Sequence, residues 1–190
     1  MGAYSDRGLP LGKANLATFI TMNPTVMYSS MQSKVPHSIL GGVKMELDSL
    51  YQEVILDHYK HPQHKGLSST FDAQVHHVNT SCGDEITLNI NLDGDCITSL
   101  SWDGQGCSIS QASVSVMSDL LIGKKLEEAV IVVNSFSQLM SSKGTSAGDP
   151  EILEDAVAFA GVSKFPGRVK CALLGWMAYK DVAIQAQARN

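Results

Sequence analysis

The sequence predicts an α+β domain in which a small three-stranded antiparallel sheet packs against about five helices. Two observations carry this prediction. Three strand-like segments follow one another closely within residues 73–103, and helical patterns occupy residues 47–60 before them and 108–187 after them. Strands separated only by short turns pair in antiparallel fashion, whereas parallel strands need a long crossover between them. With 190 residues, of which 44% are hydrophobic, the chain is long enough to bury a core.

The N-terminal segment differs in composition from the rest of the chain. Residues 1–44 lack a sustained apolar period and are rich in Ser, Gly, Pro and Met, whereas Met45 opens a far more regular sequence. We interpret residues 1–44 as a disordered extension or a mis-assigned start, with a targeting role as the alternative. Residues 45–190 are expected to form a single domain.

Charge and hydropathy argue against several classes of partner. The net charge is −5, yet residues 1–44 hold one acidic and four basic residues, so residues 45–190 are strongly acidic. Such a domain offers no basic stripe for a phosphate backbone, which argues against nucleic acid. No run approaches the roughly 18 apolar residues of a membrane span, and no secretory signal is recognisable. We therefore expect a cytoplasmic protein without a membrane partner. In cytosolic proteins, cysteine clusters usually bind metal or take part in catalysis.

The first helix is predicted over residues 47–60, where apolar residues recur at spacings of three and four. Pro62 ends it, because the residue before a proline avoids the helical conformation. Three histidines follow one another at every third position here, namely His58, His61 and His64. Since Pro62 breaks the helix that would align them, we expect a solvated helix end and no metal site.

The three strand-like segments are residues 73–79, 85–92 and 96–103. In the second segment apolar and polar residues alternate, so that Ile86, Leu88 and Ile90 share one face. A short Asp93-Gly94-Asp95 turn joins it to the third. Cys96 opens that third strand within the turn region, and we interpret it as a structural or semi-exposed residue and not as a ligand.

Four helices are predicted after the sheet, over residues 108–121, 126–140, 151–160 and 169–187. Gly123 closes the first of them as a C-cap, and Pro166 favours a helix start at the last. Together with residues 47–60, these segments supply the helical part of the expected α+β fold.

Two short motifs match enzyme classes that the surrounding pattern does not support. Residues 144–148 carry the GxSxG string of a hydrolase nucleophile elbow, but that elbow needs a strand before its serine, and here a helix precedes it. Gly104-Gln105-Gly106 can open a dinucleotide fingerprint, but Ile109 stands where the third glycine belongs. We therefore expect neither hydrolysis nor nucleotide binding.

The candidate site consists of three cysteines and one aspartate, namely Cys82, Asp84, Cys107 and Cys171. Gly83 lets the chain turn between the first two, and Cys107 follows a glycine-rich bend at the start of a helix. The positive end of a helix favours a thiolate, the form that binds metals. Three thiolates and one carboxylate make a tetrahedral set that suits zinc. The alternative is three buried cysteines that act as small hydrophobic residues, but their glycine and polar neighbours argue against it.

These segments together resemble the SufU branch of the IscU/NifU superfamily of iron–sulfur assembly proteins. The resemblance runs from about Leu50 to Tyr179. Residues 50–59 are similar to the first helix of the family, and Cys82-Gly83-Asp84, residues 104–110 and residues 164–171 are similar to its metal-site segments.

Two features favour the SufU branch over the IscU scaffolds. Lys170 stands where scaffolds place a histidine, and residues 141–160 look like an insertion of SufU-type proteins. The departures from the family pattern touch no expected ligand. They are Gln63-His64, Thr80-Ser81 and Gly167.

The resemblance implies a SufE/NifU-like fold and a zinc-dependent sulfur acceptor of the sulfurtransferase type. Its partners would be a PLP-dependent cysteine desulfurase of the SufS type and downstream iron–sulfur assembly proteins. Cys82 is the expected persulfide acceptor, because the Gly83 hinge makes it the most mobile ligand. Asp84, Cys107 and Cys171 would keep the metal, and Arg168 would orient Asp84 or a bound thiolate.

Two alternatives use the same four residues. In the first, the protein is a scaffold on which a [2Fe–2S] cluster is assembled before transfer to apo-proteins, so that iron and sulfide bind in place of zinc. In the second, zinc only stabilises the fold of a binding module. Metal and acid-labile sulfide measured on the purified protein separate the scaffold from the sulfur acceptor.

Overall fold

The computed structural model describes residues 37–189, so residues 1–36 of the expected extension lie outside the described residues and their disorder stays a prediction, whereas residues 37–44 belong to a helix. Residues 45–190 form one compact unit. The first described helix, α2, spans His37–Lys60 and begins earlier than the predicted start at residue 47. It ends just before Pro62, as the avoidance of helical geometry ahead of proline predicts.

Three antiparallel strands form one sheet in the order β1-β2-β3. They are β1 (Ala73–Asn79), β2 (Asp84–Asp93) and β3 (Cys96–Gln105). In the register, Leu88 of β2 lies between Val75 and Trp102, and all three side chains are buried on the same face. The predicted meander is confirmed, with β2 and β3 slightly longer than the pattern indicated.

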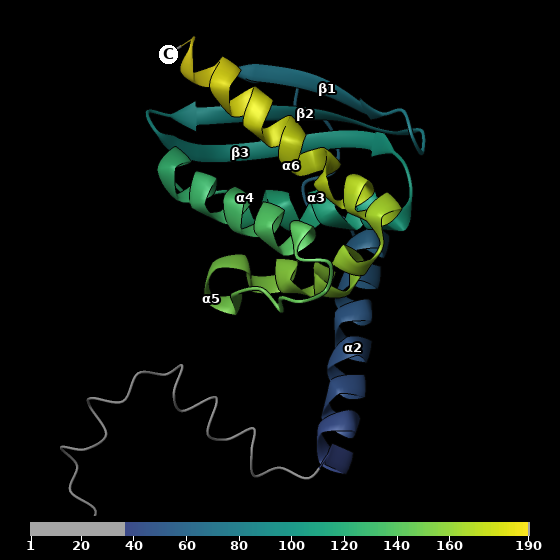
Figure 1. The fold of residues 1–190 in the computed structure, drawn as a ribbon. Coiled ribbons are helices and arrows are strands. Elements are labelled where there is room, and N and C mark those ends of the chain that lie inside the picture. The colour runs from purple at the N-terminus through teal and green to yellow at the C-terminus, as the bar shows by residue number, and fades with distance from the viewer. Residues whose placement is uncertain (1–36, 190) are drawn as a thin grey trace, which may run out of the picture. The chain divides into compact units, whose positions relative to one another are not determined.

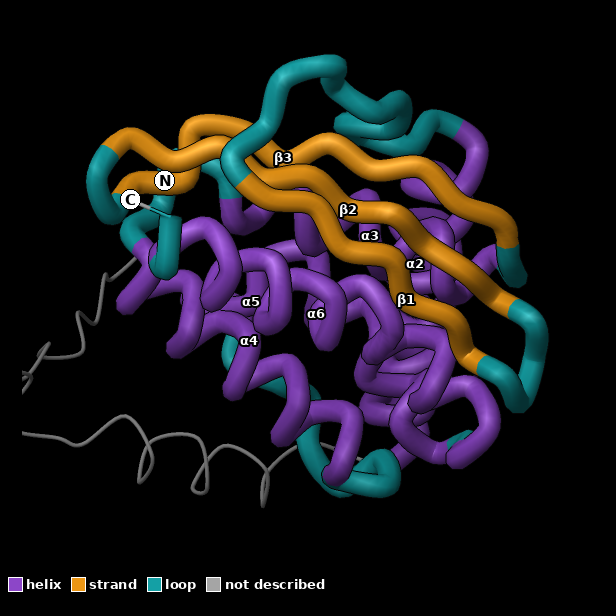
Figure 2. Tube along the Cα trace, turned by 90° about the horizontal axis from the view of Figure 1, so that it is seen from above, coloured by secondary structure: helices purple, strands orange, loops and turns teal. Residues whose placement is uncertain are grey.

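The remaining helices lie on one side of the sheet (Figures 1 and 2). Helix α6 (Pro166–Gln187) packs across β1 and β2, and α3 (Ser108–Leu121) packs against α6 and β3. Helix α4 (Leu126–Ser141) packs against α6. The α+β prediction is therefore confirmed. None of the described helices is long and apolar enough to cross a membrane.

The core between these helices is held by aromatic packing and by buried hydroxyl groups. Phe136 of α4 stacks on Trp176 of α6 with ring centroids 4.1 Å apart. The Trp176 indole donates a hydrogen bond of 2.9 Å to Ser113 of α3, and the Ser113 hydroxyl donates one of 2.7 Å to the Ala172 carbonyl. These contacts fix the start of α6 against α3, and both helices carry candidate site residues at their N-terminal ends.

The predicted helix over residues 151–160 is wrong in its form. The structure has a short α5 (Pro150–Leu153) followed by a 3₁₀ helix, η2 (Glu154–Lys164). Glu154 lies between the two with a φ of 45°, a conformation that side-chain-bearing residues rarely adopt. An α-helix cannot pass through such a residue, so the chain changes to the tighter helix there.

Candidate metal centre

The candidate ligands come from the turn after β1, the first residue of β2, the end of β3 and the start of α6. Ligand atoms of Cys82, Asp84 and Cys171 all lie within 4.8 Å of one another. The Sγ atoms of Cys82 and Cys171 are 3.4 Å apart although 89 positions separate them in the chain. The fold thus brings together residues that the sequence places far from each other.

Cys82 is exposed and sits on a tight turn that leaves β1. The carbonyl oxygen of Asn79 accepts hydrogen bonds from the backbone amides of Cys82 (3.2 Å) and Gly83 (2.8 Å). Gly83 has a φ of 75°, which glycine adopts without strain, and a Cβ there would meet no other atom. The turn therefore presents the Cys82 thiol to solvent beside the other ligands.

Asp84 is the buried centre of the site, with 3% of its surface exposed. Its Oδ1 accepts a hydrogen bond of 3.0 Å from the Cys107 backbone amide, and its Oδ2 lies 3.5 Å from the Cys107 Sγ. Burial by itself raises the pKa of this carboxyl. Hydrogen bonds from Cys82, from the Cys107 amide, from Cys171 and from Ser110 outweigh burial, so the pKa of Asp84 lies below its ordinary value.

Cys107 lies outside the tight group of three but touches Asp84, and it is half-buried. It occupies the N-cap position of α3, where its side chain makes no capping hydrogen bond. The thiol therefore stays free for another contact at the positive end of the helix. Gly106 allows this approach, because a Cβ at that position would lie 2.8 Å from the Asp84 Cγ and 2.6 Å from the Ser110 Oγ.

Cys171 is buried in the first turns of α6, and its Sγ lies 3.6 Å from the Gly167 carbonyl. Burial raises the pKa of its thiol, and the neighbouring Asp84, Cys82 and Cys107 raise it further. Each of these causes disfavours a second negative charge in the group. A divalent cation reverses that preference, since it supplies the positive charge that the thiolates and the carboxylate lack.

The donor chemistry of the four residues fits a zinc ion. Zinc is bound by thiolates and carboxylates in tetrahedral sites, and Cys82, Asp84 and Cys171 already converge to within 4.8 Å. Cys107 is positioned to add a third sulfur from the Asp84 side. Among the described residues, Cys82, Asp84 and Cys171 form the group close enough to hold a metal, and Cys107 as a fourth ligand stays a prediction.

Arg168 lies near this group at the start of α6, whereas Cys96 lies at the other end of β3, opposite Asp93. Arg168 is exposed and lines a groove of about 620 Å³ with Ile109 and Phe165, and no hydrogen bond within residues 37–189 joins its side chain to Asp84. Its orienting role stays a prediction. Cys96 opens β3, and its Sγ lies 3.6 Å from the Gly123 carbonyl oxygen. Cys107 follows the opposite end of that strand.

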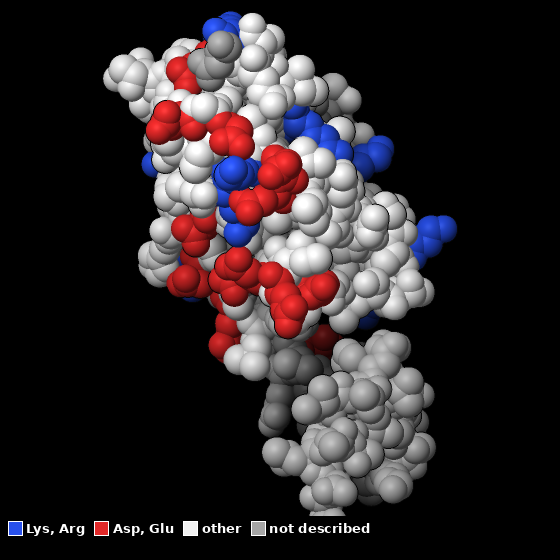
Figure 3. All heavy atoms as spheres, turned by 90° about the vertical axis from the view of Figure 1, so that its left-hand side faces the viewer, with Lys and Arg blue, Asp and Glu red and all other residues white. Residues whose placement is uncertain are grey.

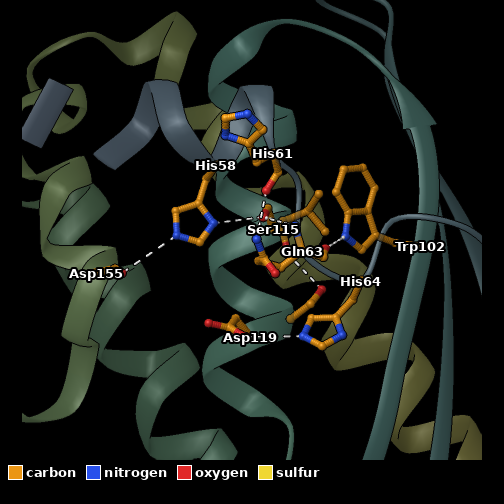
Figure 4. Close-up of polar contacts among 10 residues, drawn as sticks. His58, His61, Gln63, His64, Trp102, Ser115, Asp119 and Asp155 are labelled. Atoms are coloured by element: carbon orange, nitrogen blue, oxygen red, sulfur yellow. Dashed lines mark hydrogen bonds and ion pairs between the residues drawn. The ribbon is translucent and has the colours of Figure 1, made fainter. Parts of the chain in front are cut away.

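The expectation that the three histidines lie at a solvated helix end is wrong for His58. His58 is 8% exposed, its Nδ1 lies 2.9 Å from the Ser115 Oγ of α3, and its Nε2 lies 3.8 Å from Asp155 of η2 (Figure 4). The reason is the turn at Pro62, which carries the chain back over α3. There the backbone amide of Gln63 donates a hydrogen bond of 2.7 Å to the same Ser115 hydroxyl.

His61 and His64 are exposed and pair with different carboxylates. His61 lies 2.9 Å from Asp57 of α2. His64 lies 3.3 Å from Asp119 of α3 (Figure 4). Among the described residues, the group close enough to bind a metal contains no histidine. His58 and His64 therefore join α2 and the following turn to the rest of the domain, whereas His61 pairs only with α2.

Replacing Ser115 by alanine is expected to lower the free energy of unfolding by about 1–3 kcal/mol, because His58 and the Gln63 amide then lose a buried partner. Urea denaturation at neutral pH measures the change. Ser141→Ala is the control, since that exposed hydroxyl only donates to the carbonyl of Ser137 in its own helix. We expect the control to change the free energy of unfolding by no more than about 0.5 kcal/mol. Equal small changes in both variants would contradict the prediction.

Acidic side chains gather on one face of the domain (Figure 3). Exposed carboxylates lie on the β2–β3 turn, at the start of α4 and on α5, namely Asp93, Asp95, Glu127, Glu128 and Glu151. Two lysines lie close to such groups, since Lys124 is 3.7 Å from Glu154 and Lys125 is 3.5 Å from Asp95. This face is unsuited to a phosphate backbone.

Comparison with known proteins gives matches over most of the described chain. Residues 50–172 match the family described as NifU-like N terminal domain. The chain is 42% identical over 144 residues to the zinc-dependent sulfurtransferase SufU of Bacillus subtilis, a match that covers 76% of this chain and 96% of that protein. It is 40% identical over 136 residues to the iron–sulfur cluster assembly scaffold protein IscU of Streptococcus pyogenes, with 72% and 84% covered.

The solved structures agree with these matches. One is an iron–sulfur cluster assembly scaffold protein for the SUF system from Fervidobacterium islandicum. It superimposes with a TM-score of 0.64 at 35% identity and covers 69% of this chain and 94% of its own. A NifU-like protein from Brucella abortus has the same fold, with a TM-score of 0.68 at 22% identity, over 75% of this chain and 98% of its own.

Proposed function

Because the chain belongs to the NifU-like N-terminal domain family, we propose that it acts in iron–sulfur cluster assembly as a zinc-dependent sulfur acceptor. In this role it takes persulfide sulfur from a PLP-dependent cysteine desulfurase of the SufS type and passes it to downstream assembly proteins. The Bacillus subtilis relative, a zinc-dependent sulfurtransferase, supports this choice within the family. We also propose a cytoplasmic location, because an acceptor thiol has to stay reduced.

The observation that carries the proposal is the contrast in exposure among the ligands. Cys82 is exposed on a turn hinged at Gly83, whereas Asp84 on its strand and Cys171 on its helix are buried. A partner protein can reach the Cys82 thiol without unfolding any element. The other ligands stay fixed while that thiol moves.

The transfer step exchanges one sulfur–sulfur bond for another. The Cys82 thiolate attacks the outer sulfur of the persulfide on the desulfurase. The sulfur–sulfur bond of the donor breaks, and its electron pair leaves with the cysteine sulfur of the donor as a thiolate. A new bond joins the transferred sulfur to Cys82. No further oxidant or reductant is needed, because this is a thiol–disulfide type of exchange.

The remaining ligands prepare Cys82 for this attack. Zinc, when bound, keeps thiols deprotonated at neutral pH. Asp84, Cys107 and Cys171 would hold it while Cys82 turns outward on the Gly83 hinge. Arg168 lies about one helical turn before Cys171, where its positive charge would orient Asp84 or a thiolate.

A second candidate function is favoured by the scaffold relatives. Two similar proteins are described as scaffolds for iron–sulfur cluster assembly, and the same thiolates and carboxylate can bind iron. In that case a [2Fe–2S] cluster would form on these residues before its transfer to apo-proteins.

The test is the metal and sulfide content of protein purified without oxygen, followed by reaction with a cysteine desulfurase and free cysteine. We expect about one zinc per chain, neither iron nor acid-labile sulfide, and one added sulfur located on Cys82 by mass spectrometry. Iron with matching sulfide would favour the scaffold. Absence of an added sulfur on a zinc-loaded chain would reject the sulfur-acceptor proposal.

Zinc binding is expected to release protons and to strengthen as the pH rises from about 6 to about 8, because the thiols bind only as thiolates. Burial raises the pKa of Cys171, so its thiol is protonated in the metal-free chain and its proton has to leave when zinc binds. Calorimetry in buffers of different ionisation enthalpy measures the released protons. A zinc affinity independent of pH over this range would contradict thiolate ligation.

A further inference from the structure

The turn that carries Cys82 is organised by one residue, Asn79, the last residue of β1. Its carbonyl oxygen accepts from the amides of Cys82 and Gly83, and the Cys82 Sγ lies 3.9 Å from the same oxygen. Its side-chain Oδ1 accepts a hydrogen bond of 3.1 Å from the Ser81 amide. Both oxygens of Asn79 thus shape the acceptor loop.

The side-chain nitrogen of Asn79 has no such role in the resting structure. Nδ2 is buried and is one of two buried side-chain polar atoms without a hydrogen-bond partner among residues 37–189, the other being the Tyr179 hydroxyl. A buried donor without a partner is costly, so it requires an explanation. The local turn does not provide one, because that turn uses only the oxygens.

The position of Asn79 in the sheet indicates what this donor can meet. Asn79 is the direct cross-strand partner of Asp84, so both side chains lie on the same face of the antiparallel pair. Asp84 belongs to the metal centre together with Cys82 and Cys171. The unpartnered amide therefore lies next to the site where sulfur would arrive.

We propose that the Asn79 Nδ2 group donates a hydrogen bond to the sulfur atom that Cys82 carries after transfer. The inference rests on the proposed sulfur-acceptor function and adds a positioning residue to it. The outer sulfur of a persulfide is an anion when deprotonated, and a fixed neutral donor stabilises an anion through a charge-assisted hydrogen bond. Asn79 neither gains nor loses a proton, so the balance of the transfer step is unchanged.

This role predicts that the lifetime of the persulfide can change without a change in folding or zinc binding. A purely structural residue would change all of these properties together. The oxygens of Asn79 accept the hydrogen bonds that shape the loop in the resting protein. The nitrogen acts only once the extra sulfur is present. A variant that keeps an oxygen acceptor but lacks the amide N–H should therefore fold and bind zinc normally and yet lose the persulfide faster.

Asn79→Ser is that variant, because a serine hydroxyl can close the same kind of turn. Asn79→Thr is the second choice should the serine variant fold poorly. Asn91→Ser is the matched control, since Asn91 donates to the Thr70 carbonyl and to the Ser99 hydroxyl away from the metal centre. The control loses two hydrogen bonds and reports what loss of stability alone does to the persulfide.

The persulfide is loaded in two ways on the full chain, by a cysteine desulfurase with free cysteine and by inorganic polysulfide on metal-free protein. Its half-life on Cys82 is followed by peptide mass spectrometry, and melting temperature and zinc affinity are measured alongside. We expect Asn79→Ser to shorten the half-life by about fivefold to tenfold, with the melting temperature and the zinc affinity unchanged. Asn91→Ser should leave the half-life unchanged.

An unchanged half-life in Asn79→Ser, or a loss of zinc affinity in proportion to the shorter half-life, would overturn the proposal. Loading with polysulfide tests the role of Asn79 independently of whether the desulfurase transfers sulfur to this protein. If the desulfurase fails to load the wild-type chain while the chemically loaded persulfide still depends on Asn79, the sulfur-acceptor function is rejected and the role of Asn79 stands.

Discussion

Replacing Cys82 by serine is expected to abolish sulfur transfer from a cysteine desulfurase to this protein, with no added sulfur detectable by mass spectrometry. A hydroxyl cannot replace the thiolate that attacks the persulfide, and the buried Cys171 thiol is not accessible to a partner protein. The fold should survive, since Cys82 is exposed on a turn, and the free energy of unfolding of the metal-free chain should change by no more than about 0.5 kcal/mol.

Cys96→Ser is the control for this experiment. Cys96 is also a free cysteine, but it lies in the β2–β3 turn region outside the ligand group. We expect the control to accept sulfur like the wild-type chain. Sulfur acceptance by Cys82→Ser at the wild-type rate would show that another cysteine is the acceptor. Equal loss of stability and sulfur transfer in Cys82→Ala would instead favour a zinc that only holds the fold.

Replacing Gly106 by alanine is expected to weaken zinc binding by about tenfold to a hundredfold, the size of effect seen when residues that orient metal ligands are changed. The added Cβ would lie 2.8 Å from both Cγ and Oδ1 of Asp84, closer than such atoms approach in folded proteins. Either Asp84 or the strand end has to move, and the 3.0 Å hydrogen bond from the Cys107 amide to Asp84 is then lost. Competition with a chromogenic chelator measures the zinc affinity.

Gly167→Ala provides the matched control on the neighbouring element. Gly167 lies in the first turn of α6, and a Cβ there would meet no atom within 4 Å. Alanine is the better helix former, so we expect unchanged zinc affinity and equal or slightly higher stability. If Gly106→Ala bound zinc as tightly as Gly167→Ala, the close approach of the β3–α3 bend to Asp84 would not matter for the metal.

The residues of the candidate site could be proposed from the sequence because their neighbours carry local information, and the structure places three of them together. Gly83 beside Cys82 and the glycines before Cys107 mark turns, and each thiol stands next to polar residues and not within an apolar run. The sheet could also be predicted, since the alternation of apolar and polar residues in 85–92 and the Asp93-Gly94-Asp95 turn are properties of adjacent residues. Such signals need no knowledge of distant contacts.

Three features of the structure had no signal in the local sequence pattern. The burial of His58 follows from the way the chain turns back over α3 to Ser115. The change from α-helix to 3₁₀ helix occurs at Glu154, whose unusual backbone angle no residue-level preference indicates. The side-chain nitrogen of Asn79 is buried without a hydrogen-bond partner, and the strand register places Asn79 directly opposite Asp84. Neither fact can be read from the sequence.

The sequence by itself therefore determined the α+β class and the order of the strands, because hydrophobic period and glycine placement act over a few residues, and it proposed four candidate ligands. The tertiary structure decided which candidate ligand is exposed, how closely Cys82 and Cys171 approach, and which buried donor is left without a partner. Those properties depend on packing between elements up to 89 positions apart, and burial and pairing over such distances arise only when the whole core forms.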